Sequence, residues 1–369
     1  MSNSAARPPE SRRPPCYLLS LLIPVYSFMF VLTGPHSALS AFLWVLPMWF
    51  TVLLDMWSTQ SPVRSTAEKQ GLSYNCILYV LAALQIVTIP TLLQMATDLK
   101  FATPLDWTTS VMNLFAIKVI VGTSSSFSGI VVAHELIHRG DAFNRNLGRL
   151  LLSLECYEHF ATEHILGHHR NFSRRTDPAT ARYGESFEAF WRRTVPAQFQ
   201  NAWALENKRL NLPHGFSADS RYLEHRVAQG MVFESGLLVT VFLLSGVVGM
   251  VAFAVQAIAA IRKLEAVNYI EHWGLESVSQ QPQSQLSWDT DSWFTLSSIV
   301  GLSRHSDHHR NACKPYHELE HTPESPKLPY GYFASVFLTV FFNLRFQKLA
   351  RHQLQQMELQ VVEPDATGR

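Results

Sequence analysis

Histidine is the residue whose number and spacing point most directly to chemistry in this chain. The chain has 16 histidines, and nine of them fall into four short clusters. The clusters are HELIH (134–138), EHILGHH (163–169), NYIEHWG (268–274) and HSDHH (305–309). A separation of four residues puts two imidazoles on one face of a helix, one turn apart. Because imidazole is a ligand for zinc, copper, iron and nickel, the clusters predict a metal site.

Nine imidazoles are too many for one metal ion and suit two ions with four or five ligands each. Ordinary surface histidines would explain one His-x-x-x-His pair. They do not explain four clusters beside apolar stretches, three of which repeat a helical spacing. The clusters therefore predict a histidine-rich dinuclear site.

Acidic residues lie next to or within these clusters. A metal-binding histidine usually donates its other N–H group to a carboxylate or a carbonyl oxygen. We expect this supporting role for the following residues: Glu135, Glu163, Asp177, Glu271 and Asp307.

The first cluster also allows a different interpretation. His134-Glu135-Leu-Ile-His138 satisfies the HExxH motif, in which two histidines bind zinc and the glutamate is the general base of a metalloprotease. A membrane zinc protease needs only one further ligand. It leaves six or more clustered histidines unexplained, so the dinuclear site is favoured.

The elements that must position these residues are apolar helices. Charged residues make up 16% of the chain, against about 25% in ordinary soluble domains. Six apolar segments approach the roughly 20 residues that a membrane-spanning helix needs. They are 17–33, 37–54, 75–97, 107–133, 231–245 and 250–267. The sequence predicts an all-α integral membrane protein with a bundle of six transmembrane helices.

Basic residues predict the orientation of this bundle. The connections 34–36 and 246–249 carry no Lys or Arg, and 98–106 carries only Lys100. The opposite side carries Arg7, Arg12, Arg13, Arg64, Lys69, Arg139, Arg145, Arg262 and Lys263. Because basic loops stay in the cytoplasm, we expect both termini and every histidine cluster there. A metal transporter, the other alternative, would place its ligands near mid-membrane rather than at one edge.

The predicted domain organisation follows from these spans. Residues 1–347 form a single membrane-embedded domain, whose cytoplasmic cap comprises 139–229 and 272–330. Residues 348–369 form a polar C-terminal tail.

Composition excludes several other functions. Lys and Arg number 30 against 29 Asp and Glu, so no strong positive charge indicates nucleic-acid binding. The four cysteines form no CxxC pair, and no GxGxxG loop is present. The chain therefore has no iron–sulfur, rubredoxin or dinucleotide-binding module of its own. Any redox reaction at the metals needs an external electron donor.

The clusters resemble those of a known family. HELIHR (134–139), EHILGHH (163–169), NYIEHWG (268–274) and RHSDHH (304–309) are similar to the histidine signatures of the membrane alkane 1-monooxygenases. These enzymes belong to the membrane fatty acid desaturase and hydroxylase superfamily. The resemblance covers about 105–345 and includes TDPATARYGES (176–186) and LENKRL (205–210). NYIEHWG favours the hydroxylase branch, because ordinary acyl desaturases do not share it.

The resemblance implies terminal hydroxylation of medium- or long-chain n-alkanes with dioxygen at a non-haem centre of two Fe ions. It implies that the electrons come from rubredoxin and its reductase, and that the protein lies in a bacterial inner membrane. The implied iron ligands are His134, His138, His164, His168, His169, His272, His305, His308 and His309. His159 is expected near the site, but not as a ligand.

The substrate stays open at this stage. The sequence departs from the family pattern at Cys156-Tyr157-Glu158 and after RHSDHH, at 310–315. Relatives in the same branch hydroxylate aromatic methyl groups or convert fatty acids to 1-alkenes, and desaturation is a further alternative. Phe42, Trp44 and Trp49 could line a substrate channel. The residues that could dock an acidic donor, or meet lipid headgroups, are Arg170, Arg174, Arg175, Arg192 and Arg193.

Overall fold

The computed structural model describes residues 16–58, 71–213, 219–276 and 285–357. Within these ranges the regular elements are helices, and the one β-type contact is an isolated bridge between Asp289 and Lys327. The predicted all-α class is confirmed. Arg7, Arg12, Arg13, Arg64 and Lys69, which contributed to the predicted orientation, lie outside the described residues.

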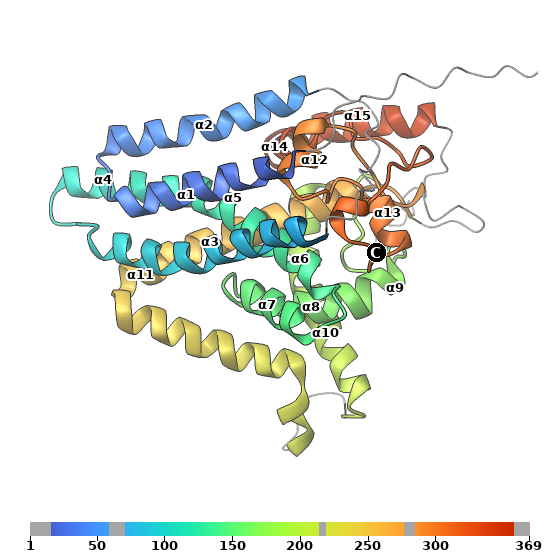
Figure 1. Ribbon diagram of the computed structural model, residues 1–369, viewed down its shortest axis with the longest axis horizontal. Helices are drawn as coiled ribbons and strands as arrows, with labels where there is room; N and C mark the ends of the chain where they lie inside the picture. Colours follow the sequence, from blue (N-terminus) through green and yellow to red (C-terminus); the bar gives the residue numbers. More distant parts are fainter. Residues whose placement is uncertain (1–15, 59–70, 214–218, 277–284, 358–369) are drawn as a thin grey trace, which may run out of the picture.

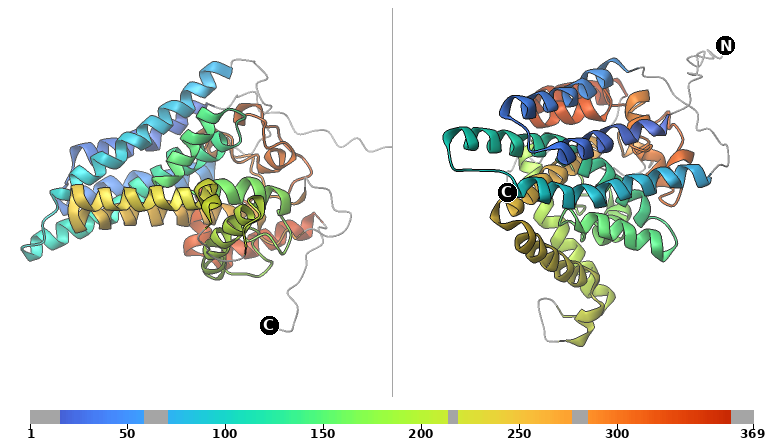
Figure 2. Two further views of the ribbon diagram at one scale, coloured as in Figure 1. Left: turned by 90° about the horizontal axis from the view of Figure 1, so that it is seen from below. Right: turned by 60° about the vertical axis from the view of Figure 1, so that its left-hand side comes forward.

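Long apolar helices form one end of the molecule (Figure 1). The chain begins with the short helix η1 (Tyr17–Leu21) and α1 (Leu22–Thr33), followed by α2 (Ala38–Trp57) and α3 (Gly71–Thr97). The left view of Figure 2 shows the long helices extending away from a side where short helices and loops gather. In the described residues four helices are long and apolar enough to cross a membrane. The count of six spans stays a prediction.

The fourth apolar segment is a continuous helix from Pro104 to Ile137. It consists of α4 (Pro104–Ala116), the π-helix η2 (Ile117–Val121), α5 (Gly122–Ser124), the π-helix η3 (Ser125–Val131) and α6 (Val132–Ile137). A capping box between Thr103 and Asp106 starts it. At 1.5 Å per residue, 34 residues span about 50 Å, more than the roughly 30 Å hydrocarbon core. The end that carries His134 can therefore project beyond the lipid tails.

Helix α11 (Arg226–His272) contains the break that the sequence predicted within 246–249. Gly246 has φ 63° and ψ −161°, a backbone conformation essentially restricted to glycine. In Figure 1 the chain turns back on itself here, so the two halves form a helical hairpin. The second half ends at His272, which places this histidine at the end of the bundle where the other clustered histidines lie.

Shorter helices gather at that end. They are α7 (Ala142–Ser153), α8 (Phe160–Thr162), the π-helix η4 (Glu163–His168), α9 (His169–Asn171), α10 (Phe187–Arg209), η5 (Ser220–Glu224), α12 (Trp293–Ser298), α13 (His305–Arg310), η7 (Tyr316–Glu318), α14 (Tyr332–Phe341) and α15 (Asn343–Gln356). Helix α10 packs against η4, α8 and α11.

Two of these helices differ from the expectation. The apolar helix α14 was not predicted, and it packs against α2 and α11. Helix α15 continues beyond residue 348, where the sequence predicted the polar tail to begin. Phe346, Ala350 and Leu354 recur every four residues on α15 and are buried. This narrow apolar stripe holds a helix of otherwise polar composition onto the molecule.

A buried aspartate connects α2 to the segment that carries the last histidines. Asp55 is fully buried, and its carboxylate accepts hydrogen bonds from the hydroxyl groups of Ser292 (2.7 Å) and Thr295 (2.6 Å). It also accepts one from the backbone N–H of Ala334 (3.0 Å). The end of α2 is therefore fixed to the starts of α12 and α14.

The buried apolar side chains form two core clusters. The first core cluster includes Phe30, Phe190, Trp273 and Phe346, and the second includes Leu78, Val132, Leu151, Tyr157 and Phe253. Phe127 and Leu302 pack against both clusters and therefore mark where they meet.

Candidate metal centre

The structure brings all nine clustered histidines together in two groups. The five-histidine group contains His134, His138, His164, His169 and His308. The four-histidine group contains His168, His272, His305 and His309. In each group one nitrogen of every ring lies within 4.8 Å of the others. Residues far apart in sequence thus converge at the end of the bundle.

Neighbouring positions on a helix explain why there are two groups. Successive residues point about 100° apart, so His168 and His169 face different groups, as do His308 and His309. The two groups consequently share the same two helical segments. These two segments therefore set the distance between the two histidine groups.

The π-helix η4 changes the pairing that an α-helix would give. The sequence predicted that His164 and His168 share a face, as residues four apart do. In the structure they belong to different groups, and His164 is grouped with His169, five residues later. A π-helix repeats its hydrogen bonds from residue i to i+5, which aligns this pair. His134 and His138 on α6 do keep the predicted α-helical pairing.

Distances between ring nitrogens fit a shared ion in each group. The Nε2 atoms of His164 and His169 are 3.0 Å apart, and those of His169 and His308 are 3.2 Å apart. In the other group the Nε2 atoms of His305 and His309 are 2.9 Å apart. Two nitrogens that bind one ion at about 2.1 Å and at right angles would be separated by about 3.0 Å. The observed spacings match that value.

Several imidazole nitrogens are buried without a hydrogen-bond partner. They include Nε2 of His134 and His138, both ring nitrogens of His272, and Nδ1 of His305 and His309. Buried polar atoms are nearly always paired, so unpaired nitrogens within these groups need an explanation. Coordination of a metal provides one for one nitrogen of each ring.

Burial favours the protonation state that binds metals. Desolvation lowers the pKa of His164, His169, His305, His308 and His309, and the neighbouring imidazoles lower it further. These rings are therefore neutral at pH 7. Neutral imidazole is the form that donates a lone pair to a metal.

Two of the five expected carboxylates contact histidines. Asp177 Oδ2 lies 2.9 Å from Nδ1 of His168, and it also accepts a hydrogen bond from the hydroxyl of Thr180 (2.7 Å). Glu271 Oε2 lies 3.4 Å from Nε2 of His305, and its other oxygen accepts a hydrogen bond from Tyr332 (2.7 Å). Thr180 and Tyr332 were not identified from the sequence, because neither lies in a histidine cluster.

The other carboxylates fix the segments instead. Glu135 pairs with Arg139 (2.5 Å) and accepts from the backbone N–H of Tyr316 (3.3 Å). Asp307 pairs with Lys314 (2.9 Å). These contacts join α6 and α13 to the segment between residues 314 and 320. Glu135 is paired with Arg139, and both histidines of the HExxH motif belong to a group of five. The geometry therefore does not support Glu135 as the general base of a zinc protease.

Glu163 and His159 lie beside the histidine groups. One oxygen of Glu163 accepts a hydrogen bond from Asn201 (3.1 Å), and the other is buried without a partner. His159 contacts the rings of Tyr157 and Phe199, at centroid distances of 4.4 and 5.3 Å. It belongs to neither group, consistent with the expectation that it is not a ligand.

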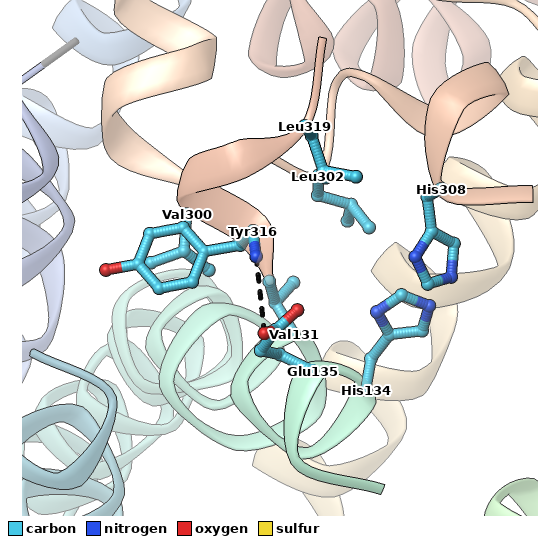
Figure 3. Close-up of a pocket in the computed structure, with 8 residues that line it drawn as sticks. All are labelled: Val131, His134, Glu135, Val300, Leu302, His308, Tyr316 and Leu319. Carbon is cyan, nitrogen blue, oxygen red and sulfur yellow. Dashed lines mark hydrogen bonds between the residues drawn. The ribbon is translucent and has the colours of Figure 1, made fainter. Parts of the chain in front are cut away.

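A small pocket with both polar and apolar walls opens next to the five-histidine group (Figure 3). Its walls are Val131, His134, Glu135, Val300, Leu302, His308, Tyr316 and Leu319. Its volume of about 10 Å³ approaches the lower limit for a single water molecule. Neither lysine nor arginine is among the lining residues, so the pocket offers no charged anchor to an anionic ligand.

The expected channel residues lie elsewhere. Phe42 and Trp49 on α2 are 45% and 40% exposed, as side chains in contact with lipid would be. Trp44 packs against Tyr26 with a centroid distance of 4.8 Å. None of the three lines the pocket beside the histidines, and their contribution to a channel stays a prediction.

The five arginines expected to bind a donor differ in availability. Arg193 is half-buried and pairs with Glu185 (2.8 Å), so it has a structural role. Arg192 pairs with Glu188 (3.1 Å), and Arg175 pairs with Glu276 (2.9 Å). Arg170 and Arg174 are exposed. Arg170 directly follows His169. His169 and His138 are the two partly exposed members of the five-histidine group.

Comparison with known proteins agrees with this geometry. The model of the fatty acid desaturase family matches residues 109–354. The chain is 32% identical to alkane 1-monooxygenase 1 of Pseudomonas aeruginosa over 348 residues, which cover 88% of this chain and 85% of the relative. It is 32% identical to alkane 1-monooxygenase 2 of the same organism, over 70% of this chain and 69% of the relative. It is 35% identical to alkane 1-monooxygenase 2 of Alcanivorax borkumensis, over 58% of this chain and 57% of the relative.

Proposed function

Since this chain belongs to the fatty acid desaturase family and, within it, to the alkane 1-monooxygenases, we propose that it hydroxylates the terminal methyl group of medium- and long-chain n-alkanes. The family shows the enzyme class, an oxidoreductase of the membrane. The substrate range, the metal content and the electron donor are the proposal. The observation that supports it most strongly is the pair of histidine groups at one end of an apolar bundle.

Two Fe ions suit the ligands that these groups offer. Five imidazoles would hold one ion and four the other, with Asp177 fixing the orientation of His168. When bound, iron supplies the activation of dioxygen, for which side chains alone have no equivalent. Four buried rings in the four-histidine group keep bulk water away from that ion.

The reaction balances only with an external reductant. One C–H bond of the methyl group and the O–O bond break, and a C–O and an O–H bond form to give the 1-alkanol. The second oxygen atom leaves as water with two protons. Two electrons are required, and no dinucleotide loop or CxxC pair in the sequence could supply them. A small electron-transfer protein such as rubredoxin, with its reductase, would be the donor.

We place the donor at the edge of the five-histidine group that reaches the surface. His138 and His169 are partly exposed there, and the exposed Arg170 and Arg174 would attract an acidic partner. Arg174→Glu should raise the donor concentration needed for half-maximal turnover, and the effect should shrink at high salt. Arg192→Glu, at an exposed arginine already paired with Glu188, is the control. If Arg174→Glu needs the same donor concentration for half-maximal turnover as the wild type, the donor does not dock here.

Product analysis tests the proposed reaction. The purified protein, supplied with iron, rubredoxin, its reductase and NADH, is given octane, dodecane or lauric acid in separate assays. We expect 1-octanol and 1-dodecanol. The pocket beside the histidines has no basic side chain to hold a carboxylate at the metal centre, so lauric acid should give no 1-alkene. A 1-alkene or an unsaturated acid as the main product would replace hydroxylation by decarboxylation or desaturation.

A further inference from the structure

Two lysines from different apolar helices lie close to each other. Lys118 belongs to the π-helix η2, and Lys263 belongs to the second half of α11, which packs against η2. The two helices touch at Gly122, where an added Cβ atom would lie 2.5 Å from the Cβ of Ala259. Each lysine is four residues from this contact, and the charge of Lys118 acts on Lys263. We call these two residues the lysine pair.

The lysine pair has no acidic partner among the residues that the structure describes. The ammonium group of Lys263 donates a long hydrogen bond to the backbone carbonyl of Ala259 (3.4 Å). The adjacent Arg262, by contrast, is paired with Glu188 (2.9 Å). Glu188 also pairs with Arg192, so two arginines already share its charge. Two neighbouring cations thus lack an anion in this part of the chain.

The lysine pair lies near one boundary of the membrane. Lys118 follows Pro104, the first residue of its helix, by 14 residues, or about 21 Å. Lys263 follows the turn at Gly246 by 17 residues, or about 25 Å. Since the hydrocarbon core is roughly 30 Å thick, both ammonium groups can reach the headgroups at the histidine end of the bundle. Two like charges at this depth repel each other and lose hydration, so an anion between them would stabilise both.

We propose that the lysine pair binds the phosphate group of an anionic phospholipid. Lys118 is exposed on the apolar bundle, so the site opens to the bilayer. Phe115 (42% exposed) and Ile258 (57% exposed) precede the lysines on the same helices and offer apolar surface to the acyl chains. Basic side chains between membrane helices are suited to anionic headgroups. This lipid site is independent of the reaction at the metal centre.

A lipid at this site would join two helices that carry histidines. The helix with Lys118 continues to His134, and the helix with Lys263 ends at His272. A phosphate between the two ammonium groups replaces their repulsion by two charge-assisted hydrogen bonds. Because the lipid binds the folded protein, it should also raise the unfolding temperature.

Native mass spectrometry of the detergent-solubilised protein tests this site. Phosphatidylglycerol and phosphatidylcholine with the same acyl chains are titrated onto the delipidated wild type. We expect phosphatidylglycerol to bind at least about tenfold more tightly, because phosphatidylcholine carries a cation of its own and no net charge. Equal affinity for the two lipids in the wild type would overturn the proposal, whatever the variants show.

Variants locate the lipid on the protein. Lys118→Gln and Lys263→Gln should each weaken phosphatidylglycerol binding by roughly fivefold, and the double variant should lose the preference for this lipid. Lys118→Arg should keep the preference, since it keeps the charge. Lys100→Gln, at an exposed lysine in the loop at the other end of the bundle, should bind as the wild type does. If the double variant keeps the wild-type preference, or Lys100→Gln loses as much, the lipid does not bind at the lysine pair.

Thermal unfolding separates the lipid from free phosphate. The wild type and the double variant are unfolded in detergent with added phosphatidylglycerol or with inorganic phosphate. We expect the lipid to raise the unfolding temperature of the wild type but not that of the double variant, and phosphate to raise neither. If inorganic phosphate stabilises the wild type as much as the lipid does, the ligand is free phosphate and the lipid site is wrong.

Discussion

At the scale of single residues, the orientation of His168 depends on one buried carboxylate. Asp177 Oδ2 contacts His168 Nδ1 and the hydroxyl of Thr180, and Oδ1 accepts the backbone N–H of Ala179 (3.1 Å). Both oxygens are thus held by the protein, so the aspartate cannot turn away. A carboxylate fixed in this way holds the imidazole ring and increases its basicity as a ligand.

Replacing this carboxylate should weaken metal binding without removing a ligand. We expect Asp177→Asn to bind iron about 10- to 100-fold more weakly than the wild type, measured by competition with a chelator. Asp291→Asn is a matched control, because Asp291 contacts His321 at 2.8 Å and that histidine belongs to neither group. Equal iron affinity in the two variants would contradict the role of Asp177.

The division of the nine histidines makes a second prediction at this scale. His272→Ala removes one of four ligands, and His138→Ala removes one of five. We expect the His272 variant to retain about one iron per chain, because the five-histidine group is intact. The His138 variant should retain more, since four imidazoles remain around its ion. Metal analysis after dialysis distinguishes them, and loss of both irons in His272→Ala would show that the groups are not independent.

The sequence predicted which histidines gather, but not how they divide. Helical spacing identified the histidines of three clusters, and the resemblance of NYIEHWG to the family signature identified His272. Their division depends on the i to i+5 repeat of η4 and on the angle between adjacent residues, which spacing alone does not reveal. Tyr332 supports Glu271 from a helix about 60 residues away in sequence, so only the fold brings it to the site.

At the scale of elements, the hairpin in α11 depends on one glycine. Gly246 and Gly236 both have open space where a Cβ atom would be added. They differ in backbone conformation, since only Gly246 has a positive φ. Any difference between substitutions at these positions therefore reports the backbone rather than packing.

Gly246→Ala should destabilise the protein by about 1–3 kcal/mol, because alanine strongly disfavours this conformation. Gly236→Ala lies within a regular helix and should be neutral or slightly stabilising. Thermal unfolding of both variants in the same detergent makes the comparison. Similar unfolding temperatures for the two variants would show that the chain does not need a glycine at the turn.

Elements were predicted well where apolar runs are long. The segments predicted at 17–33, 37–54 and 75–97 are helical, and the chain breaks at Gly246, within the predicted 246–249. Helix α14 was missed because its ten residues are too few for a span, and α15 because its apolar stripe is narrow. The π-helices have no sequence signal of comparable strength.

At the scale of the whole molecule, the histidine end and the loop between α3 and α4 lie at opposite ends of the apolar helices (Figure 1). The basic residues predict that the histidine end lies in the cytoplasm. Cys313 is exposed at the histidine end, and Asp98 is exposed in the loop. These positions allow the orientation to be measured.

A membrane-impermeant maleimide should distinguish the two ends in intact spheroplasts. A variant that keeps only Cys313 should be labelled after permeabilisation alone, whereas a cysteine-free background with Asp98→Cys should be labelled from outside. The reverse pattern would mean that the bundle is inserted the other way, and the donor would then have to act on the opposite side of the membrane.

The central claim is that nine imidazoles from four segments hold two iron ions. The most direct measurement is the metal content of the purified wild-type protein by mass spectrometry, combined with Mössbauer spectroscopy of ⁵⁷Fe-enriched material. We predict two irons per chain, in two environments of nitrogen-rich coordination, since one group offers five histidines and the other four. One zinc per chain, or a single iron that occupies only one group, would contradict the account.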